Sequence, residues 1–197
     1  MIAARQTFLG GGGAKLPYDA EVEYLESTGT QWIDTGIYLT NNHSVEIDFQ
    51  LTTLSQSRTG LFGGLATSRY GGLISPSNQK LEFGYGSSNV WYQIEPDTSR
   101  HYAKQLKNLL YVDDVLINTF EQATFTQNYS APLGNFNYIN YTPAKAKYYS
   151  SKWYDGDTLV RDFIPVRVGG VGYMYDRVSR QLFGNQGTGT FGYGNDK

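Results

Sequence analysis

Hydrophobic and polar residues alternate along much of this chain, and the alternation is clearest in one central segment. Apolar residues occupy every second position from Val45 to Leu51, and polar residues occupy the positions between them. A period of two predicts a strand with one buried face and one face in solvent. Shorter runs of strand-forming residues predict further strands at 22–25, 31–33, 61–65, 73–74, 81–85, 90–94, 101–106, 109–112 and 115–120.

The densest strand and turn signals lie between residues 145 and 191. Aromatic residues that suit a half-buried pleated surface precede Asp155-Gly156, a pair that accepts the positive φ angles of a hairpin turn. The next run is expected to end at Pro165, because proline cannot donate to a central ladder. Gly169-Gly170 and residues 176–180 predict two more turns. The segment therefore predicts three or four antiparallel strands.

Composition supports an all-β fold in one domain. The 197 residues include 23 glycines and 17 tyrosines, whereas charged residues make up only 17%. Short strands joined by tight turns have such a composition, while helices are richer in Ala, Leu, Glu and Lys. A chain of this length suits a single β-sandwich and is long enough to bury a sizeable core.

Two parts of the chain carry a family resemblance. EYLESTGTQWIDTGI near the start, with LVRDFIPV and GVGYMYDRVSRQLFGNQGTGTF near the end, resembles the laminin-G-like or concanavalin A-like domains of phage structural proteins and gut-bacterial surface proteins. The resemblance implies an antiparallel two-sheet β-sandwich with jelly-roll topology over residues 21–197. It implies a function less directly, because one fold hosts many functions.

Residues 1–20 are expected to form an extended N-terminal arm. Phe8 and Leu9 are apolar but follow no sustained period, and a run of glycines at 10–13 provides a flexible joint. In this interpretation Phe8 and Leu9 dock on a neighbouring subunit, either another virion protein or a second copy of the chain. The alternative is a frayed terminus without a partner.

Charge and composition argue against several classes of partner. The net charge of −2 gives no electrostatic footprint for nucleic acid, and no apolar run is long enough for a membrane span. The absence of cysteine excludes disulfides and thiolate metal sites. Arg5, Gln6 and Thr7 interrupt the apolar core that a signal peptide needs, which favours a protein assembled in a bacterial cytoplasm.

Catalytic signals are weak. Glu46 and Asp48 resemble the nucleophile and its helper in the E-x-D-x-x-E strand of laminarinase-type glycoside hydrolases. Leu51 occupies the position of the acid/base residue and cannot donate a proton, so the strand lacks half of the required carboxylate pair. His43 and His101 have no second ligand at metal-binding spacing, and both are expected to be solvated.

No cofactor is expected, with calcium as an alternative, because the related domains include calcium-binding ones. A calcium ion takes six to eight oxygen ligands. Five aspartates near predicted turns offer such oxygens, although turn chemistry alone also explains aspartate at these places. They are Asp34, Asp113, Asp114, Asp155 and Asp157.

Glycan recognition is the strongest chemical hypothesis. Apolar C–H faces of sugar rings stack on aromatic side chains, while amide and hydroxyl groups bind the sugar hydroxyls. Tyr85, Trp91 and Tyr92 lie beside polar residues 87–89, and Tyr138 and Tyr141 lie beside two asparagines. Either cluster is a candidate site, and the alternative for each is core packing.

The sequence and the resemblance together predict a non-enzymatic structural or decoration protein of a gut bacteriophage virion, on its head or tail. The protein would be assembled in the cytoplasm of the host bacterium and would display a lectin-like domain that adheres to glycans. The first alternative is a free carbohydrate-binding protein of a gut bacterium. A glycoside hydrolase is the second.

Overall fold

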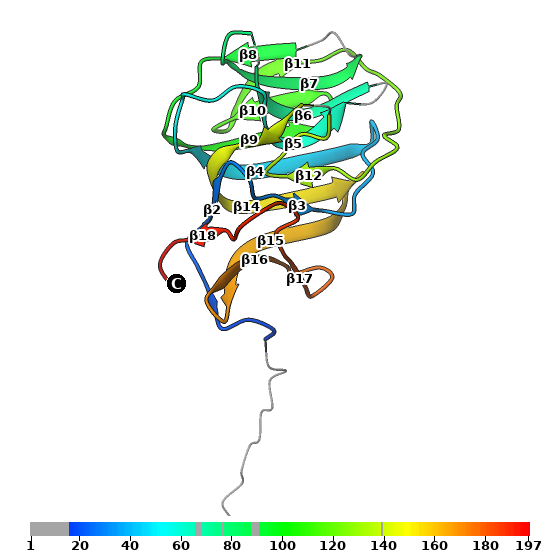
Figure 1. Cartoon of the computed structure of the whole chain (residues 1–197). Coiled ribbons are helices and arrows are strands. Elements are labelled where there is room, and N and C mark those ends of the chain that lie inside the picture. The colour runs from blue at the N-terminus through cyan, green and yellow to red at the C-terminus, as the bar shows by residue number, and fades with distance from the viewer. Residues whose placement is uncertain (1–15, 66–67, 76, 88–90, 139) are drawn as a thin grey trace, which may run out of the picture.

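The computed structural model describes residues 16–65, 68–75, 77–87, 91–138 and 140–197. This part of the chain contains strands and turns but no helix, and the strands form two sheets (Figure 1). Every strand pair is antiparallel except the short pair between β13 and β5. The all-β class predicted from the alternating pattern is therefore confirmed.

The large sheet has the strand order β11-β10-β9-β4-β14-β15-β16-β17, with three short strands added to it. Of these, β1 pairs with β15, β2 with β14, and β18 with β2. The strands are β1 (Ala20–Glu21), β2 (Leu25–Thr28), β4 (His43–Leu51), β9 (Arg100–Leu106), β10 (Leu109–Val112), β11 (Val115–Thr119), β14 (Lys145–Asp155), β15 (Thr158–Val168), β16 (Val171–Asp176), β17 (Gln181–Phe183) and β18 (Gly192–Tyr193).

The small sheet has the order β3-β12-β5-β6-β7-β8, and β13 also pairs with β5. Its strands are β3 (Ile33–Asp34), β5 (Thr59–Leu65), β6 (Ser68–Ile74), β7 (Leu81–Ser87), β8 (Trp91–Ile94), β12 (Pro132–Leu133) and β13 (Thr142–Pro143). The predicted pairing of the strands near residues 81–85 and 90–94 is present, with Phe83 opposite Tyr92.

One core lies between the two sheets. The apolar side of β4 is buried as its alternation predicted, with Val45 and Ile47 both at 0% exposure. Phe62 of the small sheet meets Trp153 of the large sheet edge to face, with ring centroids 6.2 Å apart. Since one buried cluster contains side chains from both sheets, the molecule is a β-sandwich.

The predicted hairpin turns have the backbone that their residues favour. Asp113 and Asp114 both have positive φ, at 51° and 65°, and connect β10 to β11. Gly156 follows β14, and Gly169 and Gly170 connect β15 to β16, all three with positive φ. The turns at Gly156 and at Gly169-Gly170 fix the antiparallel register of the three strands β14, β15 and β16.

The expectation that Pro165 ends a strand is wrong. β15 continues to Val168, and Pro165 lies opposite Met174 of β16. The Pro165 carbonyl accepts a hydrogen bond from Val22 N (3.0 Å), so its backbone polar side faces the N-terminal segment and not β16. The pairing with β14 has ended at Phe163. The proline therefore removes no bond from the β15–β16 ladder.

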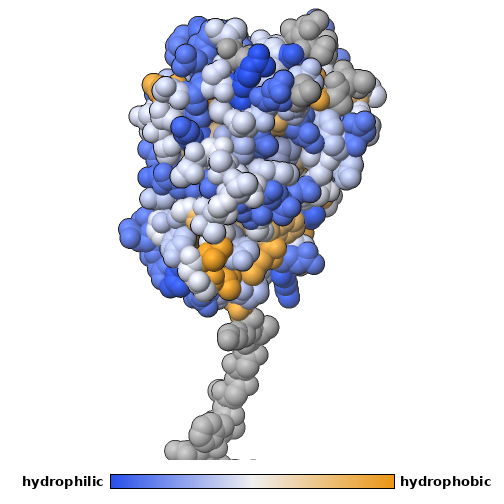
Figure 2. All heavy atoms as spheres, viewed as in Figure 1, coloured by the Kyte–Doolittle hydropathy of each residue, from blue (hydrophilic) through white to orange (hydrophobic). Residues whose placement is uncertain are grey.

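The described chain begins on the outer side of β15 and β16. Tyr18 packs edge to face on Tyr175 at 5.0 Å, and Asp19 N donates to Arg167 O (2.9 Å). Phe8 and Leu9, the predicted docking residues, lie outside the described residues. Figure 2 shows an apolar area near this end of the molecule, where Leu16 is 53% exposed. No helix suited to crossing a membrane occurs in the described part of the chain.

Candidate functional site

The two segments that carry the family resemblance lie against each other. Gln186 N donates to Trp32 O (2.8 Å), and Thr188 N donates to Thr30 O (3.1 Å). Between them, Gly187 allows a close approach, because a Cβ there would lie 1.8 Å from Thr30 O. Asn185 Oδ1 accepts a hydrogen bond from Trp32 N (3.0 Å). The C-terminal loop thus holds the backbone of Trp32 on both sides.

Trp32 lines an open pocket of about 480 Å³, which we call the aromatic pocket. Its volume is within the range of small-molecule sites. Aromatic, amide and hydroxyl side chains share the wall with one carboxylate, and the lining residues are Trp32, Asp34, Tyr38, Asn128, Tyr129, Ser130, Pro132, Asn135, Phe136, Asn137, Tyr138 and Tyr141.

Exposed rings surround the pocket. Tyr38 is 56% exposed and Tyr138 is 46% exposed. Tyr138 and Tyr141, which the sequence analysis paired, lie 6.0 Å apart between ring centroids. Phe136 is buried beneath them, 5.4 Å from Tyr141, and fixes that ring from below. The second predicted cluster is therefore assembled in one place, with ring faces open to solvent.

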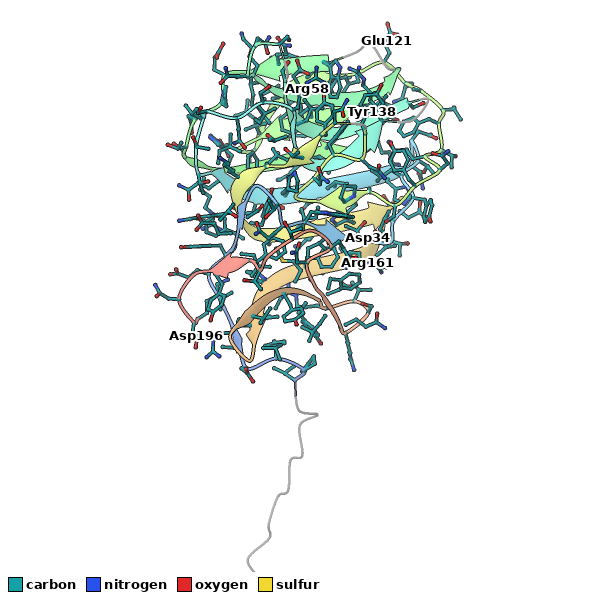
Figure 3. The ribbon with its side chains drawn as sticks, in the orientation of Figure 1. Asp34, Arg58, Glu121, Tyr138, Arg161 and Asp196 are labelled. Carbon is teal, nitrogen blue, oxygen red and sulfur yellow. The ribbon has the colours of Figure 1, made fainter. Side chains whose placement is uncertain are left out.

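Asp34 is the carboxylate of the pocket (Figure 3). Ser130 Oγ and Gly36 N (3.0 Å) both donate to its Oδ1. Its Oδ2 has no hydrogen-bond partner among the described residues. One oxygen thus fixes the side chain, while the other is free to accept from a ligand hydroxyl.

The Tyr129 hydroxyl is an unusual feature of the pocket wall. The ring packs on Gly64, where a Cβ would lie 2.6 Å from the Tyr129 Cε2 atom. The hydroxyl is buried and has no hydrogen-bond partner among the described residues. Burial raises the pKa of this phenol, so it stays protonated. A buried hydroxyl without a partner destabilises the fold unless a ligand or ordered water binds it.

The first predicted cluster is divided between two faces of the small sheet. Tyr85 is 2% exposed, its ring packs on Tyr70 and Phe125, and its hydroxyl donates to Asn41 O (3.2 Å). Tyr92 packs against the same core. Trp91 points to the opposite face, because neighbouring residues on a strand alternate. Tyr85 is thus a core residue with no ring face available to a sugar, and Tyr92 packs against the core while it stays partly exposed.

Trp91 instead lies next to the second cluster. Its ring centroid is 6.1 Å from that of Phe136, which also contacts Tyr141. The Arg69 guanidinium carbon lies 4.0 Å from the Trp91 centroid. The aromatic surface therefore extends from Tyr138 to Trp91, although these residues are far apart in the sequence.

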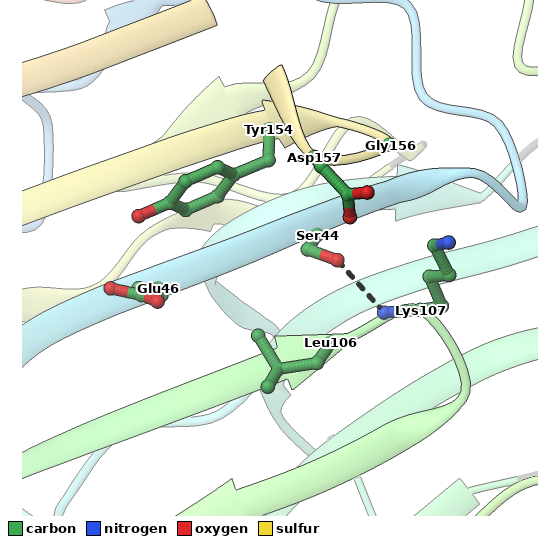
Figure 4. Close-up of a pocket in the computed structure, with 7 residues that line it drawn as sticks. All are labelled: Ser44, Glu46, Leu106, Lys107, Tyr154, Gly156 and Asp157. Atoms are coloured by element: carbon green, nitrogen blue, oxygen red, sulfur yellow. Dashed lines mark hydrogen bonds between the residues drawn. The ribbon is translucent and has the colours of Figure 1, made fainter. Parts of the chain in front are cut away.

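Glu46 lies on a different face, in an open pocket of about 410 Å³ on the large sheet (Figure 4). Glu46 accepts a hydrogen bond from the Tyr102 hydroxyl, and Asp48 forms a bidentate pair with Arg100 at 2.6 and 2.7 Å. Asp157 lines the same pocket from the β14–β15 turn, and Ser44 lies between it and Glu46 in Figure 4. The strand holds both candidate carboxylates in hydrogen bonds with other side chains.

The expectation that both histidines are solvated is wrong. His43 is 8% exposed, and its Nδ1 lies 3.1 Å from Thr40 N and 2.9 Å from Thr40 Oγ1. Burial lowers the pKa of His43. His101 lies between Asp97 and Asp113, at 2.9 and 2.8 Å. Thr40 and Asp97 are local partners, three and four residues before their histidines, whereas Asp113 lies 12 residues after His101 and is brought to it by strand pairing.

The five aspartates proposed for calcium are distributed over several turns. Asp113 contacts His101, Asp114 contacts Lys104, and Asp155 accepts from Asn42 Nδ2 (2.8 Å). Within the described ranges, no three acidic or histidine side chains are placed to hold a metal ion. Calcium binding stays a prediction.

Comparison with models of known protein families gives no match, and comparison with curated protein sequences gives none either. The assignment of the site therefore depends on its geometry. Sequence reasoning missed Trp32, Tyr38, Tyr129 and Arg69 as parts of this surface. Only Trp32 had a usable signal, since a tryptophan between the buried residues Gln31 and Ile33 faces away from the core.

Proposed function

We propose that this protein is a non-enzymatic, lectin-like module that binds glycans in the aromatic pocket. The proposal rests on one observation: exposed aromatic side chains surround the Asp34 carboxylate, of which only Oδ1 is hydrogen-bonded to described residues. Aromatic faces take up the apolar C–H face of a sugar, and a carboxylate accepts hydrogen bonds from its hydroxyls. Pockets of this kind combine apolar walls with few polar groups that set orientation.

In the proposed complex, a sugar ring stacks on Tyr138 and directs a hydroxyl toward Asp34 Oδ2. Tyr129 also lines the wall, while its hydroxyl is buried against Gly64 and is not expected to contact the sugar. Asn137 is exposed at the pocket and offers both amide donor and acceptor.

Binding by the full-length chain tests this proposal. A glycan array identifies a ligand, and isothermal titration calorimetry measures its affinity. Tyr138→Ala and Trp32→Ala are each expected to weaken binding about tenfold or more, which corresponds to roughly 1.4 kcal/mol. Tyr193→Ala is the matched control, because Tyr193 is 38% exposed but lies outside the pocket. Absence of binding, or equal losses in Tyr138→Ala and Tyr193→Ala, would reject the proposal.

We further propose that the sandwich has jelly-roll topology and is displayed on a bacteriophage particle, as the resemblance implies. The described chain begins at one end of the molecule, while β7 and β8 lie at the other (Figure 1). A protein attached through its N-terminal end would therefore present the Trp91 region outward. Mass spectrometry of purified particles is the test. Detection only as a free protein would favour the lectin of a gut bacterium.

The alternative interpretation is that the large-sheet pocket is the active site of a glycoside hydrolase. A retaining mechanism requires two carboxyl groups about 5–5.5 Å apart, one of them protonated. Glu46 and Asp48 are engaged by Tyr102 and Arg100. We expect no reducing sugar to be released from any glycan that binds. Release that disappears in Glu46→Gln would replace the non-enzymatic proposal.

A further inference from the structure

Arg69 is a cation at the edge of the aromatic surface, and it forms no ion pair with any residue that the structure describes. Its guanidinium lies over the ring of Trp91, 4.0 Å from the centroid. Its Nε and Nη1 atoms are buried and have no hydrogen-bond partner among the described residues. Burial lowers the pKa of the side chain, although an arginine keeps its charge.

Two other arginines of the described chain provide a contrast. Arg100 is paired with Asp48 and Arg167 with Asp196, each at 2.6 Å. The carboxylate that acts electrostatically on Arg69 is Glu82, which itself binds Gln93 Nε2 and forms no ion pair with the arginine. A buried charge without a partner is costly, so an anion at this place would be bound favourably.

The positive charge of Arg69 also affects the pKa of Tyr141, which lines the aromatic pocket. Burial is the main cause that raises the pKa of Tyr141, and the positive charges of Arg58 and Arg69 oppose it. Trp91, Phe136 and Tyr141 form a continuous series of ring contacts of 6.1 and 5.4 Å. Arg69 therefore lies at the end of the surface on which the proposed glycan would rest.

We propose that the site selects acidic glycans, in which one sugar carries a carboxylate that binds Arg69. The inference rests on the proposed glycan-binding function. A guanidinium forms charge-assisted hydrogen bonds with a carboxylate, and the contact with Trp91 restricts the position of the side chain. The ligand is an oligosaccharide rather than a single sugar, since one ring in the aromatic pocket does not extend to Trp91.

The test compares three ligands of equal length, using the full chain and calorimetry at low salt. They are a uronate-containing oligosaccharide, its carboxyl-reduced neutral form, and a sulfated form without uronate. The acidic ligand is expected to bind the unmodified protein about 10- to 100-fold more tightly than the neutral one, as hydrogen bonds to charged groups suggest. Added salt should reduce this preference.

Arg69→Met keeps an unbranched stem over Trp91 and removes the charge, so it should abolish the preference while neutral binding persists. Arg69→Lys keeps the charge without the fork and should retain only part of it. Arg180→Met is the control, because Arg180 is an exposed arginine in the β16–β17 turn. Thermal melting verifies that each variant is folded.

The outcomes separate the two proposals. Equal affinity for acidic and neutral forms would overturn the role of Arg69 and leave glycan binding in place. Tighter binding of the sulfated form than of the uronate form would also overturn the carboxylate assignment. Failure of all three ligands, with none found on the array, would reject glycan binding itself.

Discussion

Gly187 controls the position of Trp32 at the level of a single residue. Its Cα faces Thr30 O so closely that any Cβ would require the backbone of the C-terminal loop to move. The loop carries both hydrogen bonds to the Trp32 backbone, from Asn185 and Gln186. Stability and the proposed glycan binding are therefore expected to be coupled at this contact.

Gly187→Ala is expected to lower the free energy of unfolding by about 2 kcal/mol or more, since a clash with the Thr30 backbone forces rearrangement. Urea denaturation followed by fluorescence measures this. Gly192→Ala is the matched control: its Cβ would lie 3.5 Å from Glu26 Cβ, an ordinary contact, and a change within about 0.5 kcal/mol is expected. Similar losses in both variants would contradict the assignment.

Tyr129→Phe should leave the free energy of unfolding unchanged or increase it. The hydroxyl has no partner in the free protein, so its removal eliminates a desolvation penalty. Tyr70→Phe is the comparison, because the Tyr70 hydroxyl donates to His43 O (2.8 Å) and Gln105 O (3.0 Å). Tyr70→Phe is expected to cost about 1–3 kcal/mol. Thermal and urea unfolding of the two variants decide the matter, and an equal cost for Tyr129→Phe would refute the prediction.

Residue types predicted the aromatic clusters but not which face of the sheet each aromatic side chain occupies. Trp91 and Tyr92 were grouped because they are adjacent, and adjacency on a strand places side chains on opposite faces. Tyr138 and Tyr141 were grouped by the same reasoning and do lie together, because they belong to a loop near β13 rather than to one strand. The alternation of side chains along a strand, applied to the predicted strand at 90–94, would have placed Trp91 and Tyr92 on opposite faces.

At the scale of elements, His101 connects two loops. Asp97 belongs to the connection from β8 to β9, and Asp113 belongs to the β10–β11 turn. Burial alone would lower the pKa of His101, but the hydrogen bonds to Asp113 and Asp97 outweigh burial and raise it. The hydrogen bond to His101 also lowers the pKa of Asp97.

The sign of the resulting pH dependence follows from these shifts. The contribution of protonated His101 is complete below its unfolded pKa of about 6.5 and is lost as pH rises through the raised folded value. The contribution of ionised Asp97 is complete above its unfolded pKa of about 3.9 and is lost as pH falls through the lowered folded value. The cluster therefore stabilises the fold most between about pH 4 and 6.5.

His101→Gln should remove this pH dependence. The difference in unfolding free energy between the unmodified protein and the variant is expected to be largest near pH 5.5 and smaller at pH 8.5. It should stay below about 1 kcal/mol, because both aspartates are more than half exposed. His43 is present in both proteins, so its own titration cancels. A difference that grows with pH would reverse the conclusion.

Strand existence was more predictable than strand bounds. The period-2 alternation and turn residues identified β4, β9, β10 and the C-terminal hairpins, because both signals are local. The continuation of β15 through Pro165 was not predictable in this way. It depends on which segment lies beside each edge of the strand. At Pro165 that segment is the one near Val22, which is distant in the sequence.

For the whole molecule, the alternating pattern predicted an all-β fold and the resemblance implied two packed sheets, but neither gave the strand order. The aromatic pocket collects side chains from β3, the segment around Tyr129 and the segment around Tyr138. Such a site arises only when the sheets and their connecting segments are complete. Local signals therefore gave the class of the fold, while the position of Trp32 beside Tyr138 required the three-dimensional structure.

The N-terminal segment shows where the sandwich itself begins. Tyr18 covers a small outer cluster of Ile164, Val166 and Tyr175, which is separate from the main core. Glu21 pairs with Val166, and Asp19 Oδ2 accepts from Gly169 N (2.7 Å). Contacts between the start of the described chain and the large sheet thus extend across the boundary at residue 20 that the sequence suggested.

Two truncations locate this boundary experimentally. Removal of residues 1–15 is expected to leave thermal stability and glycan affinity unchanged, because Tyr18, Asp19 and β1 all remain. Removal of residues 1–21 uncovers Val166, which is 0% exposed, and should cost about 2–4 kcal/mol through lost apolar burial and strand pairing. Calorimetric melting of both truncated proteins measures the difference. If removal of residues 1–15 destabilises the fold as much as removal of residues 1–21, the sandwich depends on residues before Leu16, and an independent docking arm must be abandoned.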